Sequence, residues 1–489
     1  MKYVRYLLLI GCLVSGLYFT VDAAVLSLQD AIEIAVYKSN RGEIIEGDLE
    51  VARQQYQAER INFYVPDISI NGSLPVYSVT ENFDYLPGQT DKTQNKYTNM
   101  NFDADITLEQ SLITGGEFTI RSRLFNREQE FPQVFRLQND STFISDVTQI
   151  NKQGSVDFSF SQPLLKPSQP KNDLKNRRDD MHIAEYVNIE ELANLKKEVV
   201  EAYFGVLQTE LQLSVKKFTT ESKLIQKNID SAKFIDEIIS EETWLTSASE
   251  LIDAELEQFD KEIEHREKIR ELAQVLDLED GETVGTKMPV IANHISNGEK
   301  QRLINNYENS IPILKAQLEY DKAERQANFT ASSHGLTGTL EANYSLVRGD
   351  IEVQDELSTN NTDSWGLSVN FTLPLWDGGA KGAEIKAAKL SSKKSKIEFE
   401  KTKKSARSEI SSLVNKLDIS YNKLQVITKQ IELAQNKLDI AKYRMEDGQI
   451  SRIEFLESEV YFLETQDKYL EELKTYFNTK FDIEGRYIS

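Results

Sequence analysis

The sequence has very little of the two residue types that most often bind zinc. Cys12 is the only cysteine among 489 residues, so neither a disulfide framework nor a cysteine zinc site can form within the chain. The four histidines are too scattered for a local metal motif; they are His182, His265, His294 and His334. A P-loop, a nucleophile elbow and a glycine-rich dinucleotide turn are also missing. We therefore expect no enzyme activity, no metal site and no cofactor.

Long hydrophobic runs are missing as well. Hydrophobic residues make up 39% of the chain, below the roughly 45–50% of average domains. After the N-terminus no run of about 18 apolar residues occurs, which excludes a polytopic helical membrane protein. A transmembrane β-barrel is compatible with this composition, because alternating strands leave little hydropathy signal. The net charge of −22 argues against nucleic acid as a partner.

The one apolar segment lies at the N-terminus and is typical of an export signal. Lys2 and Arg5 precede an apolar core over 7–21, and Val21 and Ala23 are the small or aliphatic residues at the positions that a signal peptidase reads. We place the signal peptide at residues 1–23, with cleavage near Ala23. The alternative is a lipoprotein box over 9–12 that would lipidate Cys12. The apolar run continues past Cys12, which favours ordinary cleavage.

Glycine and proline are absent from long stretches. Neither residue type occurs in the 65 residues from Ala383 to Asp447. Between residues 171 and 280, Gly205 is the only glycine, and proline does not occur. At 1.5 Å per residue, such a helix extends about 97 Å. This length exceeds that of globular helices several-fold and indicates coiled-coil-like packing.

The chain is predicted to contain two tandem copies of one unit. Residues 158–164 correspond to 369–375 at an offset of 211, and residues 49–58 correspond to 318–327 at an offset of 269. The difference of 58 assigns an insert of that size to the first copy, between Pro66 and Pro163. Each copy is expected to contain a helix, strands and a long helical hairpin.

Four segments alternate apolar and polar residues, which predicts strands with two different faces. Each is about 9–11 residues long, the length that a tilted strand needs to cross a bilayer. The apolar positions are Ile68, Ile70, Leu74 and Val76; Val156, Phe158 and Phe160; Leu340, Ala342, Tyr344 and Leu346; and Trp365, Leu367, Val369, Phe371 and Leu373. Any one of these strands alone would suit half of a soluble sandwich. Four of them, together with long helices and an export signal, favour a water-filled membrane barrel, with Trp365 and Trp376 as interfacial aromatic residues.

These features resemble the TolC family of outer-membrane channel proteins over nearly the whole mature chain. The resemblance rests on residues 26–31, on the strand-to-helix junctions 162–165 and 373–379, and on the turn 448–451. It implies a mixed α+β, mainly α fold with two tandem structural repeats. In the family, a trimeric outer-membrane β-barrel, with four of its twelve strands from each protomer, continues as a long periplasmic α-helical barrel. An open sheet edge is not tolerated in lipid, which independently favours oligomerisation.

The resemblance also implies a function. Family members are the exit ducts of tripartite efflux pumps and type I secretion systems, and they pass substrates without doing chemistry. The implied partners are two further copies in a homotrimer, a periplasmic adaptor protein, an inner-membrane RND or ABC transporter, and outer-membrane lipid. The implied location is the bacterial outer membrane, with an extension into the periplasm. The alternative is a periplasmic structural coiled-coil protein without channel activity.

The domain boundaries follow the two copies. After the signal peptide we expect a first periplasmic helix (24–65), first barrel strands (66–164), a first long helical hairpin with an equatorial segment (165–302), a second periplasmic helix (303–335), second barrel strands (336–376) and a second long helical hairpin (377–489).

The insert in the first copy is predicted to be a β-hairpin. Apolar and polar residues alternate on both sides of Thr114-Gly115-Gly116, over about 104–125. Two added strands per protomer would preserve the up-down order and raise the barrel to eighteen strands. The alternative is a β-extension outside a normal barrel. We favour the extension, because the helical tunnel of the family matches twelve strands.

The hairpin turns are the candidate functional ends. The resemblance assigns adaptor and transporter docking to Gly448 and Ser451 at one turn, and to Glu237 and Ser240 at the other. Because family members usually have glycine at both turns, Glu237 predicts a less sharp first turn.

The resemblance also assigns a pore constriction to residues near the second turn. Glu454 and Glu457 occupy the positions of constriction carboxylates, and three-fold rings of them would select cations. In other members a Tyr and an Arg side chain hold this turn closed. This chain has Met445 and Ile450 at those two positions. We therefore expect an apolar or purely electrostatic constriction.

Basic residues follow the predicted membrane strands. The segment from Lys381 to Glu409 has ten Lys or Arg and four acidic residues, and Lys166 and Lys171 occupy the equivalent place in the first copy. We expect these cations to contact lipid phosphates and to fix the depth of the barrel.

Overall fold

The structure is a computed structural model, and it describes residues 24–84, 93–136, 142–278, 284–289, 295–353, 356–373 and 375–487. The predicted signal peptide with Cys12, and also His294 and Pro374, lie outside these residues. The chain divides into two compact units, which we describe separately. The helical unit comprises Met1–Gly47, Asn188–Ile311 and Ala406–Ser489, and the sheet unit comprises Asp48–Val187 and Pro312–Ser405.

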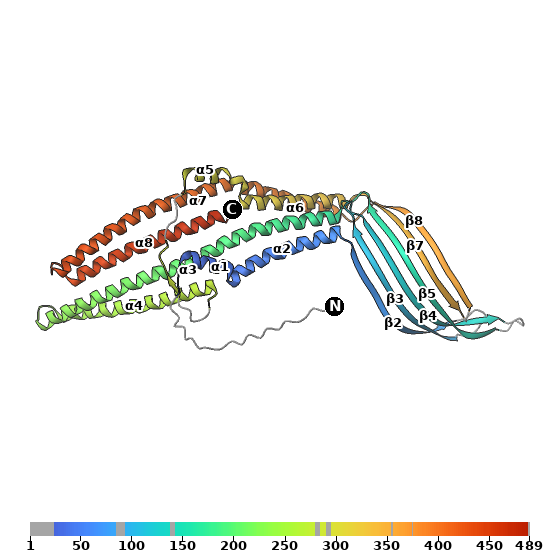
Figure 1. Ribbon diagram of the computed structural model, residues 1–489, viewed down its shortest axis with the longest axis horizontal. Helices are drawn as coiled ribbons and strands as arrows, with labels where there is room; N and C mark the ends of the chain where they lie inside the picture. Colours follow the sequence, from blue (N-terminus) through green and yellow to red (C-terminus); the bar gives the residue numbers. More distant parts are fainter. Residues whose placement is uncertain are drawn as a thin grey trace, which may run out of the picture. The chain divides into compact units, whose positions relative to one another are not determined.

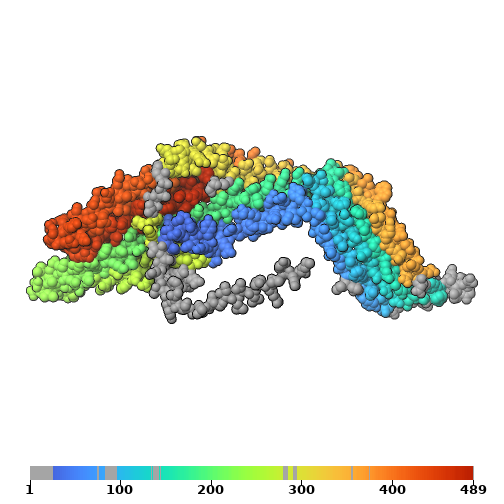
Figure 2. Space-filling model, viewed as in Figure 1, coloured from blue at the N-terminus to red at the C-terminus, as the bar shows by residue number. Residues whose placement is uncertain are grey.

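The sheet unit contains six strands in one antiparallel sheet of order β2-β3-β4-β5-β7-β8 (Figure 1). The strands are β2 (Asp67–Asp84), β3 (Thr93–Ser111), β4 (Glu117–Arg136), β5 (Thr142–Pro163), β7 (Thr337–Val353) and β8 (Glu356–Thr372). Figure 2 shows them as one continuous surface that runs in colour from blue to orange. They are longer than the predicted 9–11 residues, because pairing continues beyond the apolar segments into polar ends.

The inserted hairpin consists of β3 and β4, and it lies inside the sheet. β3 pairs with β2 from Glu109 to Thr93, and β4 pairs with β5 from Glu117 to Arg136. The sequence favoured a β-extension outside a normal barrel; in the described sheet the hairpin instead lies between β2 and β5. The alternation over 104–125 did not reveal this, because it specifies two strand faces but not which strands are neighbours.

The remaining elements are mainly long helices, as expected. They are α1 (Leu28–Tyr37), α2 (Asn40–Tyr64), α3 (Gln169–Ile235), α4 (Glu241–Leu276), α5 (Asn297–Asn305), α6 (Ile311–Ser333), α7 (Ala380–Glu446) and α8 (Arg452–Glu484), with a 3₁₀ turn (Tyr307–Asn309) and the short strands β1 (Ala24–Leu26) and β6 (Val284–Thr286). Helices α3 and α7 each have 67 residues, and α7 begins and ends 211 positions after α3. Among the helices of the described residues, none has the length and apolarity that a membrane crossing requires.

Side-chain contacts set the order of four helices in the helical unit as α7, α8, α3 and α4 (Figure 1). The pairs that join neighbouring helices include Ser420 with Glu472, Lys197 with Asp482, and Lys216 with Glu257. Direction alternates along this series, because α3–α4 and α7–α8 are both hairpins. Helices α4 and α7 are therefore the two edge helices of this series.

The core of the helical unit lies where α3 and α8 meet α1 and the two-stranded sheet β1-β6. Tyr203 is fully buried there, and its hydroxyl bonds the carbonyl oxygen of Leu26 at 2.8 Å and the backbone N–H of Lys287 at 2.8 Å. Ser27 and Asp30 form the capping box that begins α1. This core holds together segments that are far apart in the sequence.

Candidate channel surfaces and hairpin turns

The two hairpin turns have the same backbone geometry. Glu237 has a φ of 59° and Gly448 a φ of 69°, so both lie in the left-handed region. At each turn the next residue's N–H bonds back to the helix: Ile238 to the Lys233 carbonyl at 2.8 Å, and Gln449 to the Arg444 carbonyl at 2.7 Å. The expectation of a less sharp first turn is therefore wrong. The helix-ending hydrogen bonds hold Glu237 in a conformation that glycine would adopt at lower cost.

A serine caps the helix that follows each turn. The Ser240 hydroxyl accepts the Thr243 N–H at the start of α4, and the Ser451 hydroxyl accepts the Glu454 N–H at the start of α8. Both serines occupy the turns as predicted, but their side chains are engaged with backbone.

The first turn also exposes apolar residues that the sequence reasoning missed. The side chains of Ile235 and Ile238 are 79% and 69% exposed. Beside them Phe234 stacks on Trp244 at a ring distance of 5.4 Å, and the Trp244 ring N–H donates to the Ser231 hydroxyl. The sequence pattern that could have revealed them is a cluster of apolar residues inside a turn, where polar residues are the rule.

The four predicted constriction residues lie at the second turn in different environments. The Glu454 carboxylate accepts the Ser451 backbone N–H at 2.8 Å and the Ser451 hydroxyl at 3.0 Å, which lowers the pKa of Glu454. Glu457 is exposed, whereas Met445 and Ile450 are half-buried. Glu454 is thus an anion with a structural role, because it closes the capping box of α8.

An ion pair near the second turn was also missed. The guanidinium of Arg452 binds a Glu221 carboxylate oxygen of α3 at 2.9 and 3.0 Å. Glu459 is a nearby side chain of α8. Burial raises the pKa of Glu459, and the positive charge of Arg452 offsets part of this rise. The pair of Arg452 and Glu221 connects the two long hairpins close to the second turn, and its partners are 231 residues apart in sequence.

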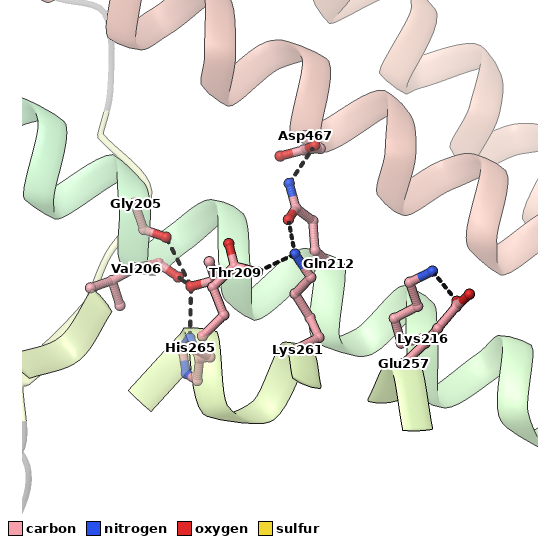
Figure 3. Close-up of polar contacts among 10 residues, drawn as sticks. Gly205, Val206, Thr209, Gln212, Lys216, Glu257, Lys261, His265 and Asp467 are labelled. Atoms are coloured by element: carbon pink, nitrogen blue, oxygen red, sulfur yellow. Dashed lines mark hydrogen bonds and ion pairs between the residues drawn. The ribbon is translucent and has the colours of Figure 1, made fainter. Parts of the chain in front are cut away.

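Polar side chains also join α3 to both of its neighbours (Figure 3). Gln212 donates to Asp467 of α8 at 3.2 Å and accepts from Lys261 of α4 at 3.1 Å. The Thr209 hydroxyl lies 3.0 Å from the His265 ring nitrogen. These contacts fix the lateral order of the helices.

One face of the sheet is apolar and exposed. One of its rows crosses all six strands in register and consists of Ile68, Leu108, Ile120, Phe158, Tyr344 and Trp365. Trp365 is 78% exposed, and Ile70 in the next row is 77% exposed. An apolar surface of this kind is rare on soluble monomers and indicates a membrane or protein partner.

The opposite face of the sheet is polar. The adjacent row consists of Glu109, Thr119, Ser159, Asn343 and Gly366. Further along this face, Arg123 makes two hydrogen bonds to the Asp103 carboxylate, at 2.9 and 2.7 Å. The face therefore suits contact with water.

Apart from Trp365, which lies within β8, the predicted membrane-interface residues lie where strands pass into helices. Trp376 follows β8 and is 89% exposed. Lys166 and Lys171 follow β5 and are exposed, whereas Lys381 in the first turn of α7 is half-buried. The Asp377 carboxylate accepts the backbone N–H groups of Gly379 and Lys381 and begins α7; these bonds lower its pKa.

Within the part of the chain that the structure describes, no cluster of three or more His, Cys, Asp or Glu could hold a metal ion. Two further histidines lie next to carboxylates, since His182 is 3.0 Å from Glu185 and His334 is 2.9 Å from Glu384.

Comparison with known proteins gives one family and several structures. Residues 305–476 match the family model of the outer membrane efflux proteins. No curated protein sequence matches the chain. The fold is similar to that of the CmeC outer membrane channel of Campylobacter jejuni, with 13% identity, a TM-score of 0.59, and coverage of 93% of this chain and 84% of that one.

Two further structures are similar over comparable lengths. The outer membrane protein VceC of Vibrio cholerae has 12% identity and a TM-score of 0.59, with 94% of this chain and 97% of that one covered. The MtrE outer membrane channel of Neisseria gonorrhoeae has 13% identity and a TM-score of 0.55, with 94% and 88% covered. Residues 305–476 therefore match the outer membrane efflux protein family, and the chain has the fold of the TolC-type outer-membrane channels.

Proposed function

We propose that the protein is the outer-membrane exit duct of a tripartite efflux pump or a type I secretion system. The observation that carries this proposal is the sheet with one exposed apolar face and one polar face, in a chain that also bears long paired helices. An apolar face suits lipid, and a polar face suits a water-filled lumen. The efflux family match over 305–476 supports the same role.

We infer a homotrimer first from the edge helix α7. It bears an exposed apolar stripe with a spacing of seven residues, at Ile419, Val426, Leu433 and Ile440. The side chains in this stripe are 56–68% exposed. Heptad spacing of apolar residues is the pattern of helix-to-helix packing, so this stripe needs a helical partner.

The other edge helix, α4, offers a matching surface. Leu245, Ile252 and Phe259 repeat every seven residues and are 52–58% exposed. Charge is complementary as well: α7 has sixteen Lys and Arg against eight Asp and Glu, whereas α4 has four against eleven. We propose that α7 of one copy packs on α4 of the next, which continues the alternation of helix direction.

The apolar face of the sheet would then contact outer-membrane lipid, with Trp365 and Trp376 at the interfaces. Lys166, Lys171 and Lys381 would lie near lipid phosphates. Only the first turns of α7 can reach the headgroups, because a helix advances 1.5 Å per residue. The lysines further along α7 therefore suit contact with the acidic helix α4 of the neighbouring copy better than contact with lipid.

The hairpin turns would dock a periplasmic adaptor protein and, through it, an RND or ABC transporter. Exposed Ile235 and Ile238 support this assignment for the turn that contains Glu237 and Ser240. Ser240 and Ser451 cap helices, so a photoreactive residue is better placed at Asp236 and Gln449. Crosslinking from these two sites should capture the adaptor; if neither site yields an adaptor adduct in a working pump, the docking assignment is wrong.

The second candidate is a periplasmic coiled-coil protein without channel activity, which the long helices alone would favour. Planar-bilayer recording of the purified protein separates the two candidates. A duct should form trimers that conduct ions, whereas a coiled-coil protein should not conduct.

Two matched variants test the assembly. Leu433→Asp places a charge in the α7 stripe and should abolish both the trimer and the conductance. Thr428→Asp places the same charge on exposed surface about 140° around the helix and should leave both intact. Trimeric, conducting Leu433→Asp would overturn the assigned interface.

A further inference from the structure

We propose that β3 and β4 are part of the membrane-spanning wall, and that three copies close edge to edge into an eighteen-stranded barrel. This inference rests on the proposed function, because it takes the sheet to be a membrane barrel. It differs from the twelve strands that the family resemblance implies.

The first argument is the continuity of pairing. β3 keeps one register with β2 from Asp67 to Ser73 and, after a bulge, pairs with it again to Asp84. β4 pairs with β5 without interruption from Glu117 to Arg136. β2 and β5 are thus separated by two complete strands in the described sheet. Moving the hairpin out of the wall would break both ladders.

The second argument is that β3, and the first part of β4 with Phe118, Ile120 and Leu124, share the apolar face of the other strands. β3 carries Met100, Phe102, Ala104, Ile106 and Leu108 on that face, a run of nine residues. Nine to eleven residues are what a tilted strand needs to cross a bilayer. An extension in water would have no reason to maintain this run.

The third argument is that the hairpin also shares the polar face. Arg121 and Arg123 of β4 lie in register with Asp157 and Ser155 of β5 on that face. Arg123 pairs with Asp103 of β3, and Asp105 of β3 accepts from Asn71 of β2 at 3.2 Å. In a closed barrel these side chains would form a charged belt around the lumen, repeated three times.

The fourth argument concerns the edges. β2 and β8 are the outer strands of the described sheet. Six antiparallel strands alternate in direction, so β8 of one copy is antiparallel to β2 of the next. Three copies then close with an even strand number and no open edge. At about 4.8 Å between strands and about 40° of tilt, eighteen strands give a backbone diameter of about 36 Å, against about 24 Å for twelve.

Cysteine substitution tests the wall directly, because the only native cysteine lies in the predicted signal peptide. Thr119→Cys and Ile120→Cys place a thiol on the polar and the apolar face of β4. Asn343→Cys and Tyr344→Cys are the matched controls, since they lie in the same cross-strand rows on β7, a wall strand in either arrangement. Each full-length variant is reconstituted in bilayers and treated with an aqueous polyethylene glycol maleimide of about 5 kDa.

We expect labelling at Thr119→Cys and Asn343→Cys to lower single-channel conductance by about half or more, because the polymer occupies the lumen. Ile120→Cys and Tyr344→Cys should react only with a lipid-dissolved maleimide. If the β7 pair behaves in this way but Ile120→Cys reacts with the aqueous reagent, or Thr119→Cys reacts without a change in conductance, the hairpin lies outside the wall. If the β7 pair also fails, the membrane barrel itself is wrong, and the proposed function fails with it.

Discussion

The two hairpin turns allow one energetic prediction with opposite signs at equivalent positions. An L-residue in the left-handed region costs about 1–2 kcal/mol, which glycine avoids. Gly448 has a φ of 69°, and a Cβ there would meet nothing within 4 Å, so Gly448→Ala adds only this backbone cost. The loss of unfolded-state entropy in alanine offsets part of it. We expect a net local destabilisation of about 1 kcal/mol.

Glu237 already carries this cost, since its φ is 59°. Glu237→Gly should therefore stabilise the first turn, by about 0.5–1 kcal/mol after the entropy of glycine is subtracted. Amide hydrogen exchange of the purified protein measures both effects at the helix-ending N–H groups. Exchange should be about fivefold faster at Gln449 in Gly448→Ala, and about two- to fivefold slower at Ile238 in Glu237→Gly.

A third variant controls for the substitution itself. Gly382 lies inside α7 with open space around it, so Gly382→Ala should stabilise its own turn. Unchanged exchange at Gln449 in Gly448→Ala, or faster exchange at Ile238 in Glu237→Gly, would refute the reasoning that the left-handed backbone limits these turns.

Three further predictions concern carboxylates. Burial raises the pKa of Glu459 above its ordinary value of 4.5, so the folded state binds this proton more tightly than the unfolded chain does. Stability is therefore lost as pH rises from about 4.5 through the raised pKa. Glu459→Gln should raise the melting temperature at pH 7 but bring no gain near pH 4. Glu454→Gln with Glu457→Gln should remove cation preference in reversal-potential recordings, and unchanged selectivity would reject the carboxylate constriction. Asp377→Ala should accelerate amide exchange at the start of α7 by about fivefold, because the helix loses its capping carboxylate; unaltered exchange there would show that the cap is dispensable.

Local features of the fold could be predicted because they depend on neighbouring residues. The capping box at Ser27 needs only Asp30, three positions on. The strand faces follow from alternation, and the length of α7 follows from the absence of glycine and proline after Gly382. The position of Gly448 in its turn follows from the conformational freedom of glycine.

Features that depend on distant residues could not be predicted in this way. The left-handed conformation of Glu237 is set by the helix that ends at it, against the preference of the residue. The pair of Arg452 and Glu221 joins residues 231 positions apart, and no local pattern marks it.

By itself, therefore, the sequence determined which segments are helices and strands, which face of each strand is apolar, and where the second hairpin turns. These are properties of short windows, in which backbone preference and side-chain period act directly. Only the tertiary structure decided that β3 and β4 stand between β2 and β5, and that α4 and α7 are the edge helices. Strand and helix neighbours are chosen by pairing over the whole chain, and an alternating strand satisfies many partners equally well until the ladder forms.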